Sequence, residues 1–405
     1  MRVRNIEYWD NKEEHGIKYD WNSIMRTYRQ LMRQAGYNDP LYDPSTIPWD
    51  NAKYFQLLSE RAAGKTTNLI LIGMIMNQMY GTQIGYIRQS EDMIKPSIAG
   101  DIFNVILSYR AGFYVKWLTD NRYEGIYIHW KKAYFCKYDE MGRPDEIAPE
   151  PFLQFLSIDH NFDYKSGFQA PFMDFIVFDE FISGTYRVNE FCDFMDLLST
   201  IIRKRKGPVV CMLSNAINYN STYFKEFEIS REVKKIKVGQ HEIITTEKGT
   251  NIYVEMIGMK QSAIKTEINR LFYGFKNPRL ASITGGEQTW SFDPVPHITH
   301  SDTDELITKN IRLDCGDCML QLELVETEDR GLIINVHEAG PKMYDDTIVL
   351  TNGEIRQPNQ LWGIGKGPLC KLIWGLYAEN KFYYDTNETG SMVANYIKTF
   401  RQLRK

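Results

Sequence analysis

The chain has 405 residues, of which 43% are hydrophobic and 25% charged, a balance typical of globular proteins rather than disordered or fibrous ones. Its length suggests two to three domains, and its net charge of −4 argues against a protein that coats nucleic acid with its whole surface. No apolar run is long enough to span a membrane, and the charged start is unlike a secretory signal peptide. Six cysteines are too few for a disulfide scaffold, so we expect a reducing compartment.

Strand-like and helix-like segments alternate between residues 54 and 230, a pattern that predicts a parallel sheet covered on both faces. The predicted strands are Tyr54–Leu58, Gln83–Ile87, Phe175–Phe178 and Pro208–Leu213, with a hairpin over Tyr123–Phe135. The predicted helices are Thr66–Tyr80, Glu91–Tyr109 and Val188–Arg203. We therefore expect an α/β domain over residues 1–230, in which residues 1–50 are an N-terminal extension.

The composition changes after residue 230. Residues 231–300 are charged or mixed and are expected to form a connector. Residues 301–405 are expected to form a smaller α/β domain, with strands Met319–Glu323, Leu332–His337, Thr347–Thr351 and Phe382–Asp385 and helices Leu369–Glu379 and Ser391–Leu403. Cys315 and Cys318 form a lone CxxC without a second pair, so we interpret them as ordinary packed or loop cysteines.

The segment from Ser59 to Thr67, SERAAGKTT, lies between a predicted strand and a predicted helix. It matches the phosphate-loop pattern G-x-x-x-x-G-K-[ST] except that Ser59 replaces the first glycine. Lys65 would reach the β- and γ-phosphates of ATP, and the Thr66 hydroxyl would bind Mg²⁺. The nucleotide-binding residues that this pattern predicts are Ser59, Arg61, Ala62, Ala63, Gly64, Lys65, Thr66 and Thr67. The alternative is a turn followed by a helix-capping threonine.

Two acids, Asp179 and Glu180, follow the apolar strand Phe175–Phe178. They would lie at the carboxyl edge of a parallel sheet, where the ligands of such sheets bind. Asp179 is expected to hold the Mg²⁺ water shell, and Glu180 to activate the attacking water as a general base. The alternative is a strand that runs into a surface loop with two solvated acids.

Two further features belong to the same region. The helix over 189–203 ends in the basic run Arg203-Lys204-Arg205-Lys206, which is either an ordinary helix end or the source of an arginine finger for a neighbouring subunit. The strand Val209–Leu213 is followed by Ser214 and Asn215, and Asn215 either senses the γ-phosphate or belongs to a strand-end turn.

Taken in order, these segments resemble the DNA-packaging (encapsidation) ATPases of phi-29-type short-tailed bacteriophages, which belong with the terminase-like motors. The resemblance covers residues 54–230 and, more weakly, 315–400, and it is carried by Arg61, Tyr86–Arg88, Ile176–Ile182, Phe194–Arg205, Leu213–Ala216, Tyr223-Phe224, Gly331–Ile333 and Lys381–Asp385. The sequence departs from the family at Ser59 and at the acidic stretch Gln89–Asp92, which leaves open whether Lys95 supports the arginine that acts in trans.

The resemblance implies an additional-strand (ASCE/RecA-like) P-loop ATPase domain and an RNase H-like C-terminal domain without nuclease chemistry. It implies a homo-oligomeric ring, a pentamer, that hydrolyses ATP with Mg²⁺ to drive double-stranded DNA through the portal into a capsid. Arg203, with Arg205, would act on the ATP of the neighbouring subunit. A phage structural RNA is a partner in the best-known member of the family, and the resemblance implies the host cytoplasm, at the procapsid and without a membrane, as the setting.

Several alternatives remain open. A terminase-type enzyme would keep an active C-terminal nuclease, although Glu323, Glu326 and Asp385 do not form a recognisable metal cluster in the sequence. A helicase or another ring DNA translocase would share the ATPase chemistry, and a structural or RNA-binding protein would have an accidental phosphate loop. Lys131, Lys132 and the cluster Lys234–Lys237 are candidates for contact with DNA phosphates, or plain solvated patches.

Overall fold

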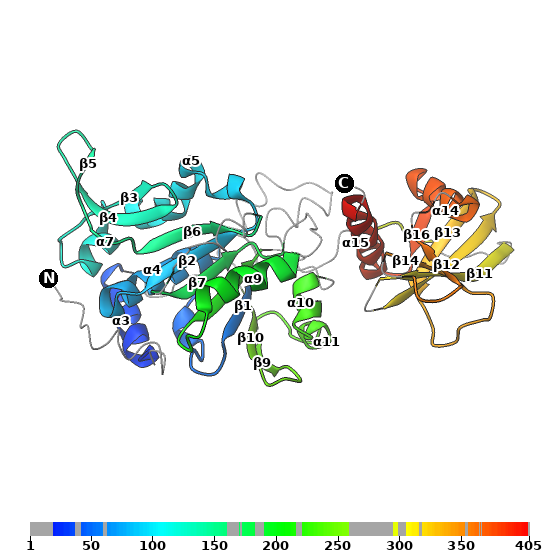
Figure 1. Ribbon diagram of the computed structural model, residues 1–405, viewed down its shortest axis with the longest axis horizontal. Helices are drawn as coiled ribbons and strands as arrows, with labels where there is room; N and C mark the ends of the chain where they lie inside the picture. Colours follow the sequence, from blue (N-terminus) through cyan, green and yellow to red (C-terminus); the bar gives the residue numbers. More distant parts are fainter. Residues whose placement is uncertain are drawn as a thin grey trace. The chain divides into compact units, whose positions relative to one another are not determined.

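The computed structural model describes residues 19–36, 42–59, 63–159, 170, 172–182, 190–215, 221–258, 295–298, 305–315, 318–352, 355–363, 365 and 367–403. The chain divides into two compact units (Figure 1). The first contains the described residues up to 215 together with 226–258, and the second contains 221–225 and the described residues from 295 onward.

A ten-stranded sheet forms the centre of the first unit, in the order β3-β4-β6-β2-β7-β8-β1-β10-β9, with β5 paired to β4. The strands from β6 to β10 in this order are parallel, and β4 and β9 run antiparallel to their neighbours. The strands are β1 (Tyr54–Leu58), β2 (Gln83–Arg88), β3 (Gly125–His129), β4 (Lys132–Tyr138), β5 (Pro144–Ile147), β6 (Leu153–Ser157), β7 (Met173–Asp179), β8 (Val209–Ser214), β9 (His241–Thr245) and β10 (Asn251–Met256).

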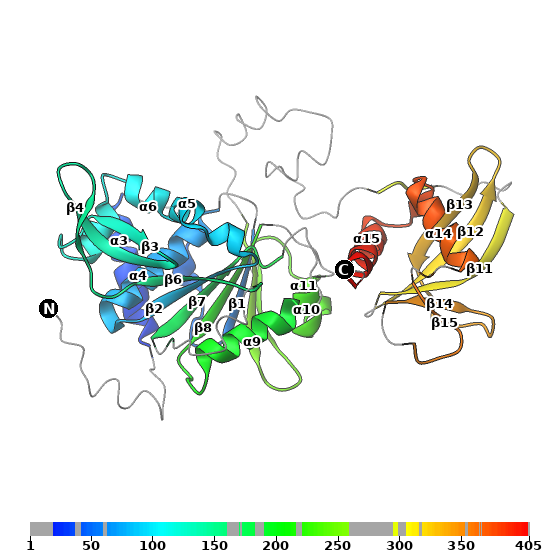
Figure 2. The ribbon, with the colours of Figure 1, turned by 45° about the horizontal axis from the view of Figure 1, so that its top comes forward.

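Helices cover both faces of this sheet, as Figure 2 shows. Along β7, Phe175 contacts Trp21 of α3 (Trp21–Gln34) and lies in the same core as α4 (Lys65–Tyr80), whereas Phe178 packs against Phe194 of α9 (Glu190–Ile202). Successive side chains of a strand point to opposite faces, so an uninterrupted apolar strand such as β7 needs a helical layer on each side. The remaining helices are η1 (Pro44–Thr46), η2 (Glu91–Ile94), α5 (Pro96–Ala99), η3 (Gly100–Phe103), α6 (Asn104–Ser108), α7 (Phe113–Leu118) and α11 (Ser230–Val233).

The predicted strands of this unit are confirmed, as are the helices after the phosphate loop and before β8. The single helix predicted over Glu91–Tyr109 is wrong. The segment is broken into η2, α5, η3 and α6, and the first break lies before Pro96, which cannot donate the hydrogen bond that a continuous helix requires.

Two parts of the first unit were missed by the sequence analysis. Residues 21–34 form α3, which is capped by Asp20 through a bond of 3.1 Å from the Ser23 N–H and buries a face of apolar residues. Residues 241–256 do not belong to a connector, because β10 pairs in parallel with β1 and adds the hairpin β9–β10 to the sheet. The boundary predicted at residue 230 is therefore corrected to a position after β10.

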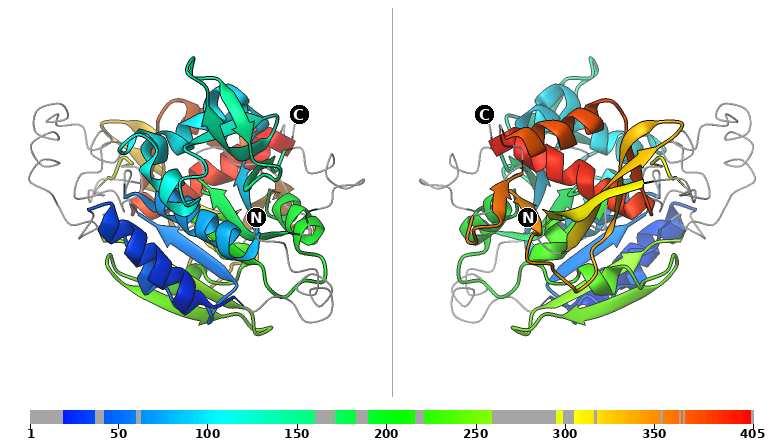
Figure 3. Two further views of the ribbon diagram at one scale, coloured as in Figure 1. Left: turned by 90° about the vertical axis from the view of Figure 1, so that its left-hand side faces the viewer. Right: turned by 90° about the vertical axis from the view of Figure 1, so that its right-hand side faces the viewer.

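The second unit contains a six-stranded sheet in the order β15-β14-β11-β12-β13-β16. Its helices α14 (Pro368–Ala378) and α15 (Asn387–Leu403) pack on one face (Figure 3). Trp374 and Tyr396 stack there, with ring centroids 6.1 Å apart. The strands are β11 (Glu305–Asp314), β12 (Met319–Thr327), β13 (Gly331–Glu338), β14 (Ile348–Thr351), β15 (Gln360–Trp362) and β16 (Phe382–Tyr384). The mixed α/β character predicted for this region is confirmed. One further short helix in the chain is α10 (Thr222–Glu226).

Candidate nucleotide site

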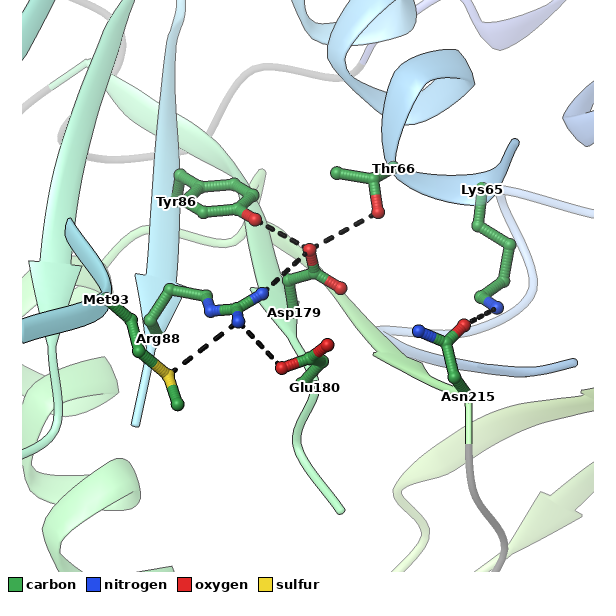
Figure 4. Close-up of polar contacts among 8 residues, drawn as sticks. All are labelled: Lys65, Thr66, Tyr86, Arg88, Met93, Asp179, Glu180 and Asn215. Carbon is green, nitrogen blue, oxygen red and sulfur yellow. Dashed lines mark hydrogen bonds and ion pairs between the residues drawn. The ribbon is translucent and has the colours of Figure 1, made fainter. Parts of the chain in front are cut away.

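Four parallel strands of the first unit end beside one another, and each is followed by, or ends in, a polar residue. Ser59 follows β1, Asn215 follows β8, β7 ends at Asp179, and β2 ends at Arg88. Because β2, β7, β8 and β1 are adjacent and parallel, their carboxyl ends meet at one edge of the sheet. Figure 4 shows the side chains that gather at this edge.

The loop between β1 and α4 brings the start of a helix to this edge. Gly64 has a φ of +81°, in the left-handed region that glycine adopts without a Cβ clash, and α4 begins at the next residue. The helix N-terminus therefore points its unpaired N–H groups toward the strand ends, which favours an anion. Ser59 and Ala63 are buried and Thr66 and Thr67 are half-buried, whereas Arg61 and Ala62 lie outside the described residues.

Lys65 is a buried cation at the centre of the site. Its Nζ donates to Asn215 Oδ1 at 2.9 Å and to Ser59 Oγ, both of which are neutral oxygen atoms. Burial lowers the pKa of Lys65 to about 8, against the opposing effect of Asp179 and Glu180. A buried ammonium whose hydrogen-bond partners are uncharged is suited to receive an anion such as phosphate. Sequence reasoning predicted both Lys65 and Asn215, and the structure brings them together.

Asp179 accepts three hydrogen bonds on one carboxylate oxygen. Oδ2 lies 3.3 Å from Thr66 Oγ1, 2.6 Å from the Tyr86 hydroxyl and 3.2 Å from Arg88 Nη1 (Figure 4). The contact with Thr66 places a hydroxyl and a carboxylate oxygen beside each other, and oxygen atoms of these kinds are the ligands that Mg²⁺ prefers. The donor set therefore fits a magnesium ion held between the phosphate loop and β7. No three His, Cys, Asp or Glu residues cluster around a metal-sized space within the described residues.

Glu180 follows Asp179 in a strained backbone conformation. Its φ is +56°, which costs of the order of 1–3 kcal/mol for a residue other than glycine and is characteristic of functional sites. Its Oε2 lies 2.7 Å from Arg88 Nη2, so one guanidinium group joins both acids.

Arg88 joins both acids of the candidate site, and the sequence analysis did not assign it a role. Burial acts to lower the pKa of Arg88, but Tyr86, Asp179 and Glu180 outweigh it, and the net shift is upward. The buried phenol of Tyr86 likewise has a raised pKa, mainly because of desolvation. In the sequence, the run Tyr86–Arg88 was noted only because it resembles the packaging ATPases. The signal that could have identified Arg88 was its position at the end of a predicted strand, in the same sheet as the strand that ends in the two acids.

The two candidate arginine fingers differ in their surroundings. Arg205 is half-buried, and its guanidinium group bonds the buried Asp174 and the carbonyl oxygens of Met173 and Ile201. This anchoring within its own subunit argues against the expectation that Arg205 acts on a neighbour. Arg203 is exposed, and its φ of +49° turns the chain at the end of α9.

The basic candidates for DNA contact lie on the surface of the first unit. Lys132, Lys234, Lys235 and Lys237 are exposed, and Lys131 Nζ lies 2.5 Å from Glu91 Oε1. Lys95 pairs with Asp92 at 2.6 Å.

No helix in the described part of the chain is long and apolar enough to cross a membrane.

The acids of the second unit are dispersed. Glu323 lies 3.2 Å from His337 Nε2 and 3.4 Å from Asn335 Nδ2 in the middle of β12 and β13. Glu326 is exposed on β12, and Asp385, which follows β16, accepts from Thr389 at 2.7 Å. Cys315 and Cys318 are half-buried next to the core of this unit, in agreement with their interpretation as packed cysteines.

No protein-family model matches the chain, and a search of curated proteins finds no match. Among solved structures, the bacteriophage Phi-29 viral genome packaging motor assembly contains a chain with 16% identity and a TM-score of 0.56, which covers 90% of this chain and 100% of its own length. The Phi-28 gp11 DNA packaging motor also has 16% identity, with a TM-score of 0.53 and coverage of 89% of this chain and 98% of its own length. The resemblance predicted from the sequence is therefore confirmed in the fold: this chain has the fold of the phage DNA packaging motors.

Proposed function

We propose that the chain is the ATPase of a viral genome packaging motor, which hydrolyses ATP to move double-stranded DNA through a portal into a preformed capsid. The observation that carries this proposal is the meeting of Lys65, Thr66, Asp179 and Glu180 at the carboxyl edge of one parallel sheet. The shared fold with two packaging motors supports the biological role.

The phosphate loop would hold the triphosphate of ATP. The N–H groups at the start of α4 would face the phosphates, and the buried ammonium of Lys65 would neutralise them. Thr66 and Asp179 would hold Mg²⁺, which when bound neutralises charge on the β- and γ-phosphate oxygens. Asn215 fixes the position of the Lys65 ammonium and lies beside the phosphate site.

Glu180 would act as the general base. The carboxylate accepts a proton from water while the water oxygen attacks the γ-phosphorus, and the bond from this phosphorus to the β–γ bridging oxygen breaks. The products are ADP and inorganic phosphate. Arg88 bridges the carboxylates of Asp179 and Glu180, and its positive charge offsets their mutual repulsion.

Arg203 would complete the site in trans. We assign this role to Arg203 and not to Arg205, because the guanidinium of Arg205 is occupied by Asp174 in its own subunit. The role implies a homo-oligomeric ring, for which the resemblance suggests a pentamer. Arg203→Ala should abolish turnover, and mixing with subunits that carry only Lys65→Ala should restore part of it. Intact mixed rings without any activity would contradict action in trans.

The second unit would dock the motor on the procapsid in the host cytoplasm, with the portal and a structural RNA as partners. We assign it to the RNase H-like class without nuclease chemistry. The scattered positions of Glu323, Glu326 and Asp385 favour this assignment over a terminase with an active nuclease. Cleavage of DNA by the full chain in the presence of Mg²⁺ or Mn²⁺ would instead identify the chain as a terminase-type enzyme with an active nuclease.

The experiment that tests the proposal is DNA-stimulated ATP hydrolysis, with and without emptied capsids. We expect hydrolysis that depends on Lys65 and increases when capsids and DNA are both present. The matched control is Lys248→Ala, at an exposed lysine in the β9–β10 turn. Absence of nucleotide binding would identify a structural protein with an accidental phosphate loop, whereas strand separation without capsids would identify a helicase.

A further inference from the structure

A buried glutamine lies next to the acids of the candidate site. Gln89 directly follows Arg88 at the end of β2, and only 5% of its surface is exposed. Its Nε2 donates to the carbonyl oxygen of Phe181 at 3.1 Å and to Oε1 of Glu190 at 3.0 Å. One side-chain amide therefore joins the end of β2, the segment after β7 and the start of α9.

The bond to Glu190 keeps the amide of Gln89 in place. Glu190 is the first residue of α9 and is itself only 6% exposed. Phe194 of the same helix packs on Phe178 of β7, with ring centroids 4.8 Å apart. A backbone carbonyl can only accept a hydrogen bond, so the NH₂ group of the amide must be the one that faces Phe181. Glu190 therefore anchors this NH₂ group to a helix that is packed on the sheet.

The bond to Phe181 helps to fix the residue that follows Glu180. The N–H of Phe181 donates to the carbonyl oxygen of Leu213 in β8 at 3.0 Å, and its own carbonyl oxygen accepts from Gln89. The ring of Phe181 is buried, with its centroid 6.3 Å from that of Phe178. Phe181 is therefore held by β8 through its N–H, by Gln89 through its carbonyl and by the core through its side chain.

These contacts account for the backbone conformation of Glu180. On one side, Asp179 pairs with Leu213 in the β7–β8 ladder, and on the other side Phe181 is fixed as described. Glu180 lies between these two points with its φ of +56°, and its carboxylate lies beside the guanidinium of Arg88 (Figure 4). A residue other than glycine keeps such a conformation only where the surrounding contacts impose it. The contacts of Phe181 therefore help to set where the carboxylate of Glu180 lies.

We propose that Gln89 is a positioning residue for the hydrolysis of ATP, which holds the backbone at Phe181 so that Glu180 directs its carboxylate toward the attacking water. The inference rests on the role of Glu180 as general base under the proposed function. A general base must lie within hydrogen-bond reach of the water that it activates, and a displacement of about 1 Å can lower the rate by about a hundredfold. Loss of the Gln89 amide should therefore lower turnover and leave the binding of ATP intact.

The test uses Gln89→Met in the full chain, a change that keeps the length of the side chain and removes the amide. We expect kcat to fall roughly 10- to 100-fold, while the Kd of ATP, measured by equilibrium titration, stays unchanged. Gln56→Met is the matched control. Gln56 is a fully buried glutamine in β1 of the same sheet, and its amide has no hydrogen-bond partner among the described residues. Its variant should keep the kcat of the wild type, and unchanged kcat in Gln89→Met, or an equal loss in both variants, would overturn the proposal.

Combination with Glu180→Gln separates positioning from a general loss of structure. If Gln89 acts through Glu180, Gln89→Met should not lower the residual rate further once Glu180 is replaced, because effects that pass through one group are not additive. Single-turnover hydrolysis measures the low rates of these variants. A double variant whose loss equals the product of the two single losses would show that Gln89 acts independently of Glu180, and this result would overturn the proposal.

Gln89→Asn tests the same role with a smaller change. Its amide is one methylene shorter and cannot reach both Phe181 and Glu190, so we expect a loss of kcat in the same direction, with thermal unfolding used to check that the variant is folded. Full kcat in this variant would overturn the proposal. If Glu180→Gln loses turnover and the Gln89 variants do not, only the positioning role fails, whereas full turnover in Glu180→Gln removes the general base of the proposed function itself.

Discussion

The two units of the molecule both end parallel strands at a common edge, but they place different chemistry there. In the first unit, the ends of β1, β2, β7 and β8 bring a buried lysine, an arginine and two carboxylates together. In the second unit, β11 and β14 end side by side, and Asp314 accepts a hydrogen bond of 3.0 Å from Thr351. A shared sheet geometry therefore does not by itself create a phosphate site.

The segment that comes after each strand explains the difference. After β1 the chain passes through Gly64 directly into α4, which adds a helix N-terminus to the strand ends. After β11 it turns back into the antiparallel β12, so no helix begins at that point. A phosphate site needs both the charged side chains and the start of a helix.

Among the variants that compare the two units, the largest effect is expected from Glu180→Gln. Loss of a general base lowers turnover by about 10²–10⁴-fold, whereas the binding of ATP should be retained because Lys65 and Thr66 are unchanged. Steady-state hydrolysis and equilibrium binding of ATP measure the two quantities. Glu323→Gln in the second unit is the matched control and should leave the rate of ATP hydrolysis unchanged. Equal losses of turnover in both variants would contradict the assignment of the chemistry to the first unit.

A smaller effect is expected from Arg88→Ala. Removal of the guanidinium leaves Asp179 and Glu180 adjacent without their shared cation, and we expect hydrolysis to fall roughly 10- to 100-fold, as for the loss of a charged hydrogen-bond partner. Arg88→Lys should recover only part of the rate, since lysine cannot bridge both acids in the same way. Full activity in Arg88→Ala would show that the acids hold their positions without it.

The buried lysine should make the stability of the first unit depend on pH. The pKa of Lys65 is about 8 in the folded chain and 10.5 as its ordinary value, so the unfolded chain binds more protons between these values. The free energy of unfolding should therefore rise with pH across this window, by on the order of 2–3 kcal/mol in the absence of nucleotide.

Lys65→Met removes this titration. Chemical denaturation of the nucleotide-free protein at pH 7 and pH 10 measures the difference between the variant and the wild type. At pH 7 the variant should have the larger free energy of unfolding. The difference in free energy of unfolding between the two proteins should shrink as the pH rises, or reverse so that the wild type is the more stable. An identical pH dependence in both would show that Lys65 is not held in a desolvated site.

The smallest effect is expected at the strand end of the second unit. Asp314→Asn should leave ATP hydrolysis unchanged and lower stability by about 1 kcal/mol, the contribution of an ordinary hydrogen bond. Thermal unfolding and the hydrolysis assay measure these quantities. Loss of hydrolysis in this variant would indicate that the second unit contributes to the chemistry.

The sequence by itself determined the parts of this protein that depend on local pattern. The strand β1, the helix that begins at Lys65 and the acids at the end of β7 follow from apolar runs and from a motif within a few residues, and these elements are observed at the expected positions. Their resemblance to the packaging motors also came from the sequence, and the shared fold agrees with it.

The tertiary structure decided what depends on contacts between distant segments. The addition of β10 to β1 joins residues about two hundred positions apart, and it moved the end of the first unit beyond the boundary that composition indicated. The contacts of Arg88 with Asp179 and Glu180 became visible only when β2 and β7 were placed side by side, since these acids lie more than ninety residues away in the sequence. Local sequence patterns do not predict which distant strands pair, because the pairing and its register are fixed by how whole faces of strands and helices pack together.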